Sequence, residues 1–208
     1  MANQVLSPTV PLRRSRRIKR INALTAILTG GLMAILLARL WPTTSEKALW
    51  GFLAGLVWAN GFEYVYHRFL LHSTVRFFAR RHLVHHVATG TPEEAEHLTF
   101  GESPLWIVPL FVLNGLAALA VERLSGLGIV AGMSTAFAVY FVALEELHWR
   151  IHLGEWLPGF LSPARVYHLA HHDRPDGRYN VFFPLFDWLL RTAHAPVMAG
   201  HKPSSPLR

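Results

Sequence analysis

Residues 104–152 read PLWIVPLFVLNGLAALAVERLSGLGIVAGMSTAFAVYFVALEELHWRIH. Two apolar runs in this stretch, Pro104–Val121 and Leu127–Leu144, contain no charged residue and are separated only by ERLSG at 122–126. At about 1.5 Å per residue, each run approaches the roughly 30 Å thickness of the hydrocarbon core of a bilayer. Because the connection is so short, we predict an antiparallel pair of transmembrane helices here.

A second pair of apolar runs precedes this stretch. Ile21–Trp41 has Arg39 as its only charged residue, and Ala48–Tyr66 has only Glu63. The basic residues before the first run resemble the start of a signal peptide, but the run is longer than such peptides have and no small-residue cleavage motif follows. We therefore expect an all-α integral membrane fold with four transmembrane helices in two hairpins.

The composition agrees with a membrane protein. Apolar residues make up 51% of the 208 residues and charged residues only 16%, whereas soluble domains carry about a quarter charged residues. Cysteine is absent, which excludes disulfides, iron–sulfur clusters and thiolate-ligated haem within the chain. We expect a basic N-terminal segment (1–20), with residues 1–15 lacking structure, a membrane-embedded domain (21–195) and a loop-like tail (196–208).

The distribution of charge predicts how the chain crosses the membrane. The net charge is +7, and much of it lies just before the first apolar run, in Arg13, Arg14, Arg16, Arg17, Lys19 and Arg20. Such a segment can bind nucleic acid, but directly before a hydrophobic run it is better interpreted as a cytoplasmic anchor. Two hairpins return residues 66–103 and 145–208, both rich in arginine, to the same side. We predict a multi-pass protein of a bacterial inner membrane or the endoplasmic reticulum, with cytoplasmic termini and no nucleic-acid partner.

Ten of the thirteen histidines follow one pattern that occurs twice, each time after an apolar hairpin. Each copy is a pair followed by a triplet H-x2-H-H. The ten are His67, His72, His82, His85, His86, His148, His152, His168, His171 and His172, and the remaining three are His97, His194 and His201. Residues three and four apart share a helix face, and neutral imidazole binds iron, zinc and copper strongly. We therefore predict a cytoplasmic helical cap in which the ten histidines bind two metal ions.

The two pairs are spaced differently. His148 and His152 share one face of a helix, but His67 and His72 are five residues apart, which is about 500° of an α-helix. The first two side chains should therefore point about 140° apart. We expect them to bind different ions, or one ion from either side of a helix distortion.

Several polar residues near these histidines are candidates to orient the imidazoles through the second ring nitrogen. They are Glu63, Glu145, Glu146, Asp173, Asn180 and Asp187. The alternative for each is an ordinary helix-end charge or turn residue. Ligation by histidine alone favours a six-coordinate borderline ion over tetrahedral structural zinc. Bis-histidine haem binding would need histidines deep within facing spans, where none of the ten lies.

Together these motifs resemble the fatty acid hydroxylase/sterol desaturase superfamily of integral-membrane di-iron enzymes. The resemblance covers residues 58–192 and rests on EYVYHRFLLH (63–72), the two triplets and NVFFPLFDWLLRT (180–192). The spacing of the two pairs is most similar to that of the fatty acid hydroxylase branch. The resemblance implies that all ten histidines bind two iron ions, with zinc as an alternative occupant in a purified protein.

The resemblance also implies an O2-dependent hydroxylase that oxidises a C–H bond of a membrane lipid, with a fatty acyl or sphingolipid-type substrate. The chain has no His-Pro-Gly-Gly motif of a fused cytochrome b5 domain, so we expect a separate electron donor, either a cytochrome b5-like protein or a ferredoxin with its reductase. Two alternatives remain open. One is a sterol or carotenoid hydroxylase or desaturase of the same superfamily, and the other is a non-enzymatic membrane metal-binding protein.

Overall fold

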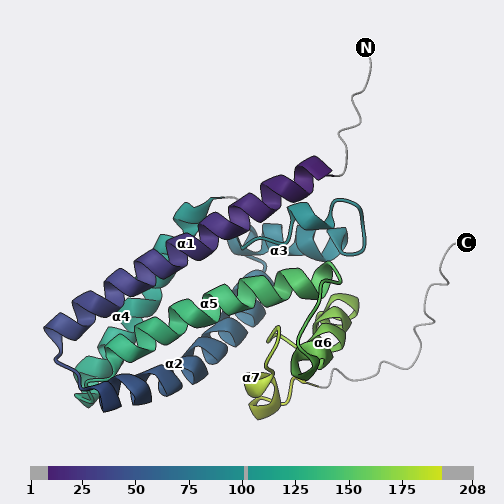
Figure 1. Cartoon of the computed structure of the whole chain (residues 1–208). Coiled ribbons are helices and arrows are strands. Elements are labelled where there is room, and N and C mark those ends of the chain that lie inside the picture. The colour runs from purple at the N-terminus through teal and green to yellow at the C-terminus, as the bar shows by residue number, and fades with distance from the viewer. Residues whose placement is uncertain (1–8, 101–102, 194–208) are drawn as a thin grey trace, which may run out of the picture.

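The computed structural model describes residues 9–100 and 103–193, and within these ranges every regular element is helical (Figure 1). In chain order the elements are α1 (Thr9–Leu40), α2 (Ser45–Tyr66), η1 (His67–Leu71), α3 (Arg76–Ala88), η2 (Glu94–Glu96), η3 (Pro104–Trp106), α4 (Ile107–Ser125), α5 (Val130–His152), η4 (Gly159–Leu161), α6 (Ser162–Asp173) and α7 (Leu185–Leu189). The all-α prediction is therefore confirmed for the described residues. The predicted tail (196–208) and residues 1–8 of the basic segment lie outside them.

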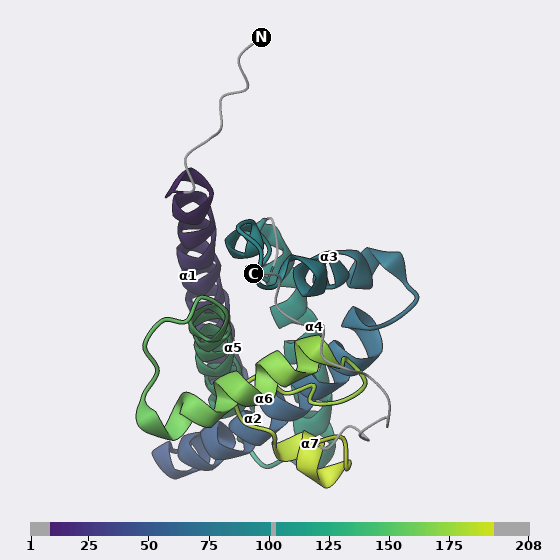
Figure 2. The same ribbon diagram turned by 90° about the vertical axis from the view of Figure 1, so that its right-hand side faces the viewer.

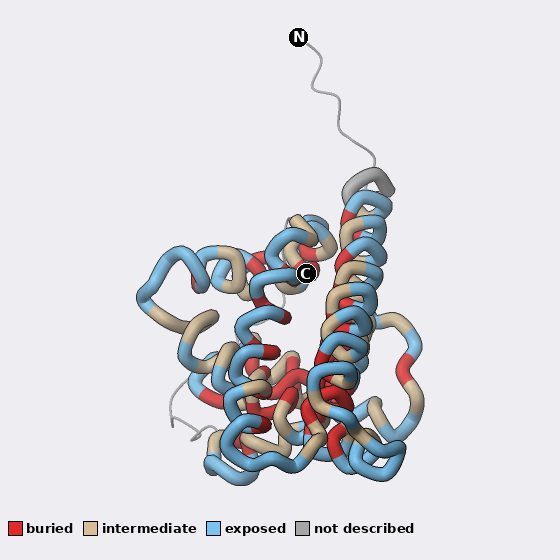
Figure 3. The backbone as a smooth tube through the Cα atoms, turned by 90° about the vertical axis from the view of Figure 1, so that its left-hand side faces the viewer, coloured by how far each residue is buried: buried red, intermediate tan, exposed pale blue. Residues whose placement is uncertain are grey.

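Helix α5 is the centre of the bundle and packs along both α1 and α2 (Figure 1). Its contacts with α4, its neighbour in sequence, are far fewer, and α1 and α2 hardly touch within the described ranges. Buried residues follow the inner faces of the helices (Figure 3), where the ring of Phe111 packs edge to face against Phe137 and Phe141. The chain reverses direction as two hairpins require, but the members of each hairpin are not the main packing partners.

Glycines allow the backbones of α2 and α5 to touch. A Cβ atom on Gly132 would lie 2.2 Å from the Ala48 carbonyl oxygen, and one on Gly51 would lie 2.2 Å from the Ile129 carbonyl oxygen. Small residues are common where membrane helices cross closely, because they let the backbones approach. A larger residue at either position would force the two helices apart.

The turn between α4 and α5 is closed by Glu122. This buried carboxylate accepts hydrogen bonds from the backbone N–H groups of Gly128 (2.6 Å), Ile129 (2.9 Å) and Val130 (3.1 Å). N–H groups at the start of a helix have no partner within the helix. One side chain therefore satisfies several of them and fixes where α5 begins.

Two helices extend beyond the predicted apolar runs, and their extensions hold each other. α1 begins at Thr9, so the expectation that residues 1–15 lack structure is wrong for residues 9–15, and α5 continues to His152. Lys19 Nζ on α1 lies 2.5 Å from Glu146 Oε2 on α5. The polar ends of both helices thus continue the contact that their apolar parts begin.

Three helical stretches are long and apolar enough to cross a membrane, judged by length and composition over the described residues. They are Leu12–Leu40, Pro104–Ser125 and Val130–His152. Helix α2 is of similar length but is not among them, and it carries Asn60 and Glu63 in its second half. The structure thus supports three of the four predicted spans.

The remaining elements gather at the end of the bundle where α5 finishes (Figure 2). Helices α3 and α6 lie across this end, and α7 docks on the side of α2. The docking depends on Gly61, because a Cβ atom there would lie 2.7 Å from the ring of Phe186. This end of the molecule carries the patterned histidines.

Candidate metal centre

Four segments bring the ten patterned histidines together, namely η1 with the residue after it, α3, the end of α5, and α6. They form two clusters of five, and the donor nitrogens within each cluster all lie within 4.8 Å of one another. The first cluster contains His67, His72, His82, His86 and His171, and the second contains His85, His148, His152, His168 and His172. Each triplet is therefore divided, because its middle histidine joins the cluster made mainly by the other copy.

The spacing of the nitrogens within each cluster fits one metal ion. Neighbouring Nε2 atoms are 3.0 to 3.3 Å apart in the first cluster and 3.0 to 3.2 Å apart in the second. Two nitrogens bound at right angles about 2.1 Å from one ion would lie about 3.0 Å apart. Lone pairs this close repel one another unless a positive charge lies between them. The two clusters also adjoin, since the rings of His86 and His172 stack with their centroids 4.2 Å apart.

The first pair shares a cluster because the chain forms a π-helix between its members. The N–H of His72 donates to the carbonyl of His67 at 3.2 Å, which is the i to i+5 bond of a π-helix. This wider turn brings residues five apart onto one side, and the two Nε2 atoms lie 3.3 Å apart. The two side chains therefore point into one cluster rather than two, and a helix distortion does lie between them.

Burial keeps the imidazoles in the neutral form that binds metals. It lowers the pKa of His67, His82, His85 and His168 well below the ordinary value near 6.5, and the neighbouring imidazoles lower it further. The same two causes lower the pKa of His86 to about 4. A protonated ring cannot bind a metal ion, so these shifts favour the ligand form at neutral pH.

Backbone carbonyls of the segment between α6 and α7 orient two imidazoles of the first cluster. His67 donates its Nδ1–H to the carbonyl of Tyr179, and His171 donates its Nδ1–H to the carbonyl of Gly177 at 2.6 Å. These bonds fix Nδ1 as the protonated nitrogen. The lone pair of each Nε2 is thereby directed into the cluster.

Three of the residues predicted to orient imidazoles hold this segment rather than the rings themselves. Asp187 accepts hydrogen bonds from the backbone N–H groups of Tyr179 (3.0 Å) and Asn180 (2.8 Å). Glu63 accepts from the Asn180 side chain (2.9 Å) and from the Val181 N–H (2.7 Å). Their influence on the first cluster therefore passes through backbone carbonyls.

The other three candidates bind elsewhere or face solvent. Glu145 is turned towards α1 and accepts a hydrogen bond from the Asn22 side chain at 2.7 Å. Glu146 forms its ion pair with Lys19. Asp173 is exposed at the end of α6. In this geometry none of the three carboxylates is placed to accept a hydrogen bond from an imidazole.

Two residues that the sequence did not single out contact imidazoles of the second cluster. Glu94 accepts a hydrogen bond from Nδ1 of His152 at 2.7 Å. Thr89 gives its hydroxyl proton to the carbonyl of His85 (2.9 Å), so its oxygen accepts from Nδ1 of His172 (3.0 Å). No spacing rule connects these residues to the histidines, because they lie in a loop that folds back after α3.

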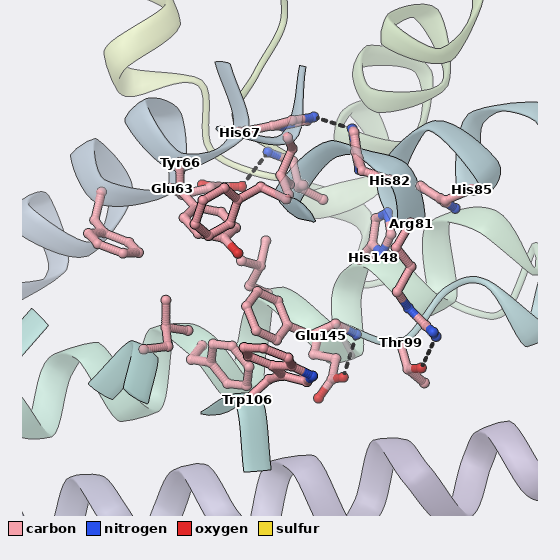
Figure 4. Close-up of a pocket in the computed structure, with 18 of the residues that line it drawn as sticks. Glu63, Tyr66, His67, Arg81, His82, His85, Thr99, Trp106, Glu145 and His148 are labelled. Carbon is pink, nitrogen blue, oxygen red and sulfur yellow. Dashed lines mark hydrogen bonds between the residues drawn. The ribbon is translucent and has the colours of Figure 1, made fainter. Parts of the chain in front are cut away.

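A cavity of about 500 Å3 reaches both clusters from the side of the bundle (Figure 4). Its inner wall includes five patterned histidines, His67, His82, His85, His148 and His168, and it also includes His97. Its other walls are mainly aromatic and aliphatic, and they include Phe62, Tyr66, Phe77, Phe78, Trp106, Leu110, Leu113, Phe137 and Phe141. Both His194 and His201 lie outside the described residues.

Three well-exposed lining residues mark the mouth of this cavity. Phe77, Trp106 and Leu113 are 69%, 51% and 66% exposed, and the rings of Phe77 and Trp106 meet edge to face with centroids 5.4 Å apart. Leu113 lies on α4, one of the helices apolar enough to cross a membrane. The cavity therefore opens to the side on which lipid would surround the bundle.

Comparison with known proteins agrees with this arrangement. A family model described as fatty acid hydroxylase matches residues 52–192, which include all ten patterned histidines. No curated protein matches the sequence. A solved structure described as full-length Scs7p, in which only the hydroxylase domain is visible, is similar with a TM-score of 0.60 and 21% sequence identity. The similarity covers 85% of this chain but only 65% of that chain, less than two thirds of its length, and at this identity it supports the fold alone.

Proposed function

Because the chain belongs to the fatty acid hydroxylase family, we propose that it is an O2-dependent di-iron hydroxylase that oxidises a C–H bond of a membrane lipid. The family match confirms the resemblance inferred from the histidine motifs. The substrate that we propose is a fatty acyl or sphingolipid-type lipid. A sterol or carotenoid substrate, desaturation in place of hydroxylation, and metal binding without catalysis are the alternatives that the experiment below separates.

The cavity is the observation that carries this proposal. Its inner wall is made by histidines of both clusters, and its other walls are apolar. A hydrocarbon chain that entered from the bilayer past Phe77, Trp106 and Leu113 would meet these histidines at the inner end. Apolar walls bind such a chain and exclude water from the carbon that reacts. Transporters place their ligands near the middle of the bilayer, whereas the patterned histidines of this chain gather at one end of the bundle. This difference disfavours a metal-transport function.

The five imidazoles of each cluster would hold one iron ion. When bound there, iron would supply the redox chemistry for the reaction of O2 with the C–H bond. The chain keeps the imidazoles neutral by burial and aims the Nε2 lone pairs of His67 and His171 through their Nδ1 hydrogen bonds. Zinc fits the same nitrogen donors and is an alternative occupant.

Hydroxylation requires a reductant in addition to O2. Each turnover consumes one O2, two electrons and two protons and gives an alcohol and one water. We propose that the electrons come from a separate partner, a cytochrome b5-like protein or a ferredoxin with its reductase.

We also propose that α2 is a fourth transmembrane helix and that the metal centre faces the cytoplasm. Helix α2 has 22 residues, enough to cross the hydrocarbon core, and its Asn60 and Glu63 are buried rather than turned to lipid. The basic start of α1 lies at the same end of the bundle as the histidines, where Lys19 pairs with Glu146. The positive-inside rule then assigns both to the cytoplasmic side of a bacterial inner membrane or the endoplasmic reticulum.

The reaction is tested with iron-loaded protein in lipid vesicles supplied with 18O2 and a reducing system, followed by mass spectrometry of the lipids. We expect one lipid to decrease and a product with one additional 18O atom to appear. The variants His86→Ala and His172→Ala should bind less iron and give no product, whereas His201→Ala should match the parent protein.

Three other outcomes are distinguishable in the same experiment. A product that has lost two hydrogen atoms and carries no label supports the desaturase alternative. A labelled sterol or carotenoid identifies the other lipid classes. Movement of metal across the vesicle membrane with no lipid oxidised contradicts the hydroxylase.

A further inference from the structure

We propose that Asn22 of α1 is a positioning residue for the second cluster, and that it acts on His148 through Glu145 and the segment Leu98–Phe100. This inference rests on the proposed function only in treating the cluster as a metal site. The family model matches residues 52–192, so Asn22 and the rest of α1 lie outside the matched region. The inference gives α1 a part in building the site in addition to anchoring the chain.

A buried polar junction joins α1 to α5 beside the cavity. Asn22 is 0% exposed and Glu145 is 6% exposed, and the Asn22 side-chain amide donates to Glu145 Oε1 at 2.7 Å. The same oxygen accepts the backbone N–H of Phe100 at 3.2 Å. An amide and a carboxylate are costly to bury unless they bond each other. Their presence between two largely apolar helices therefore points to a specific role.

The junction fixes the segment that supports His148. Glu145 and His148 are three residues apart on α5, so they lie on one side of the helix. Glu145 accepts the N–H of Phe100, and at the other end of this short segment the backbone of Leu98 lies beside the His148 side chain, where both line the cavity. In Figure 4, Glu145, Thr99 and His148 lie along one side of the cavity. The two α5 side chains thus hold the segment at both ends.

Few other contacts restrain the carboxylate. Within the described part of the chain, Glu145 Oε2 and Asn22 Oδ1 have no hydrogen-bond partner. Without the Asn22 amide, Glu145 would keep only the Phe100 N–H and would be a buried carboxylate with a single donor. The side chain would then move towards water or another donor. The segment would move with it, and His148 would lose the backbone that lies beside it.

The test is metal binding to the purified full-length chain, measured as zinc affinity by competition with a chelator. Asn22→Leu keeps the branched shape of the side chain and removes its amide. Ser134→Ala is the matched control, because it removes another buried contact between α5 and α1, from Ser134 Oγ to the Gly30 carbonyl at 3.4 Å. We expect Asn22→Leu to bind one zinc as the parent does and the second roughly tenfold to a hundredfold more weakly. Ser134→Ala should bind both ions like the parent.

Two backgrounds show which ion is affected. With His72→Ala, which disables the first cluster, adding Asn22→Leu should weaken the remaining ion. With His152→Ala, which disables the second cluster, adding Asn22→Leu should change nothing. Glu145→Gln keeps an oxygen that can accept both donors and should retain both ions, whereas Glu145→Leu should behave like Asn22→Leu.

Unchanged affinity for both ions in Asn22→Leu overturns the inference. Equal weakening of both ions, or the same weakening in Ser134→Ala, also overturns it, because either result indicates a general loss of packing. If the parent binds two ions but oxidises no lipid, the proposed reaction fails while the positioning of His148 is still decided by these variants.

Discussion

At the scale of single residues, the triplet H-x2-H-H divides its imidazoles between two clusters. At about 100° per residue, the outer two histidines lie about 40° apart around a helix, and the middle one is about 60° from the first on the other side. In α3 the outer pair is His82 and His86, which share the first cluster, while His85 joins the second. A shared helix face predicts that the three imidazoles of a triplet converge, whereas the structure divides each triplet between the two clusters. The division depends on how α3 and α6 face each other, which the sequence does not indicate.

The divided triplets give a prediction for His171. Although it belongs to the second copy, His171→Ala should remove the ion of the first cluster, so that bound zinc falls from two towards one per chain. Adding His82→Ala should cause no further loss, because both residues bind the same ion, whereas adding His168→Ala should remove the second ion. Metal analysis of the purified variants checks this. A His82/His171 double variant without any metal would show that the two residues serve different ions.

The buried imidazoles also predict how stability depends on pH. Burial, with the neighbouring imidazoles, lowers the pKa of His86 to about 4 and that of His171 to about 3, against about 6.5 in the unfolded chain. Between these values the unfolded state binds more protons, so stability rises with pH. The contribution is fully present above about pH 6.5 and is lost as the pH falls towards 4 and 3.

We therefore expect the thermal unfolding midpoint of the metal-free protein to stay level above about pH 6.5 and to fall below it. Added zinc should raise the midpoint at neutral pH and lose this effect in acid, because protons compete for the imidazoles. A midpoint that stays constant down to about pH 4.5 would show that the histidines are not buried as described.

At the scale of elements, the π-helix η1 removes the difference between the two histidine pairs. His67-x4-His72 and His148-x3-His152 look unlike in sequence, yet each pair contributes two ligands to one cluster. A π-helical turn holds one more residue than an α-helical turn, and this extra residue accounts for the wider first spacing. Regular helical geometry predicts diverging side chains at the first pair, so the sequence alone leads to the wrong orientation there.

This equivalence can be tested by changing the length of η1. Phe69 is 56% exposed, and its deletion should convert η1 to an α-helical turn with the pair four residues apart, so both ions should remain bound. Insertion of an alanine after Phe69 should turn the two imidazoles away from each other and release the ion of the first cluster. Zinc stoichiometry compares the two variants. Equal loss of metal from both would contradict the equivalence.

Sequence predicted the helical elements better than their ends. Hydropathy located the apolar runs and ended the fourth at Leu144. Because each run is near the lower length limit for a span, we expect helix to continue beyond the bilayer, and α5 does continue to His152. Apolar patterning does not give the point where such a helix ends. The start of α1 at Thr9 was missed for the same reason, since the Lys19–Glu146 pair that holds it joins residues far apart in sequence.

At the scale of the whole molecule, the arrangement around α5 decides which loops reach the site. The sequence indicated ten ligands and a membrane fold, but it could not indicate that α5 packs against α1 and α2 more than against α4. For the same reason it could not bring Glu94 to His152, or the Tyr179 carbonyl to His67. Such contacts depend on tertiary packing, which has no local signature.

The proposed topology can be tested cleanly because the chain contains no cysteine. Ser125 lies at the end of α4 and Ser162 at the start of α6, and both are exposed. A membrane-impermeant maleimide added to intact spheroplasts should label Ser125→Cys. It should label Ser162→Cys only after the membrane is permeabilised. Labelling of both from the same side would mean that α5 does not cross the membrane.

His85 and His171 each belong to the cluster made mainly by the other copy of the pattern, and this has a consequence for how the protein is made. His72 and His171 are 99 positions apart in the chain, yet their Nε2 atoms lie 3.1 Å apart. A ribosome finishes the first copy of the pattern long before it reaches His171, so the growing chain cannot complete either set of five ligands from its own first half. Neither cluster of five histidines is complete until the last quarter of the polypeptide has been translated and folded back. A truncated product that ends before α6 would therefore be left without a complete set of ligands for even one ion.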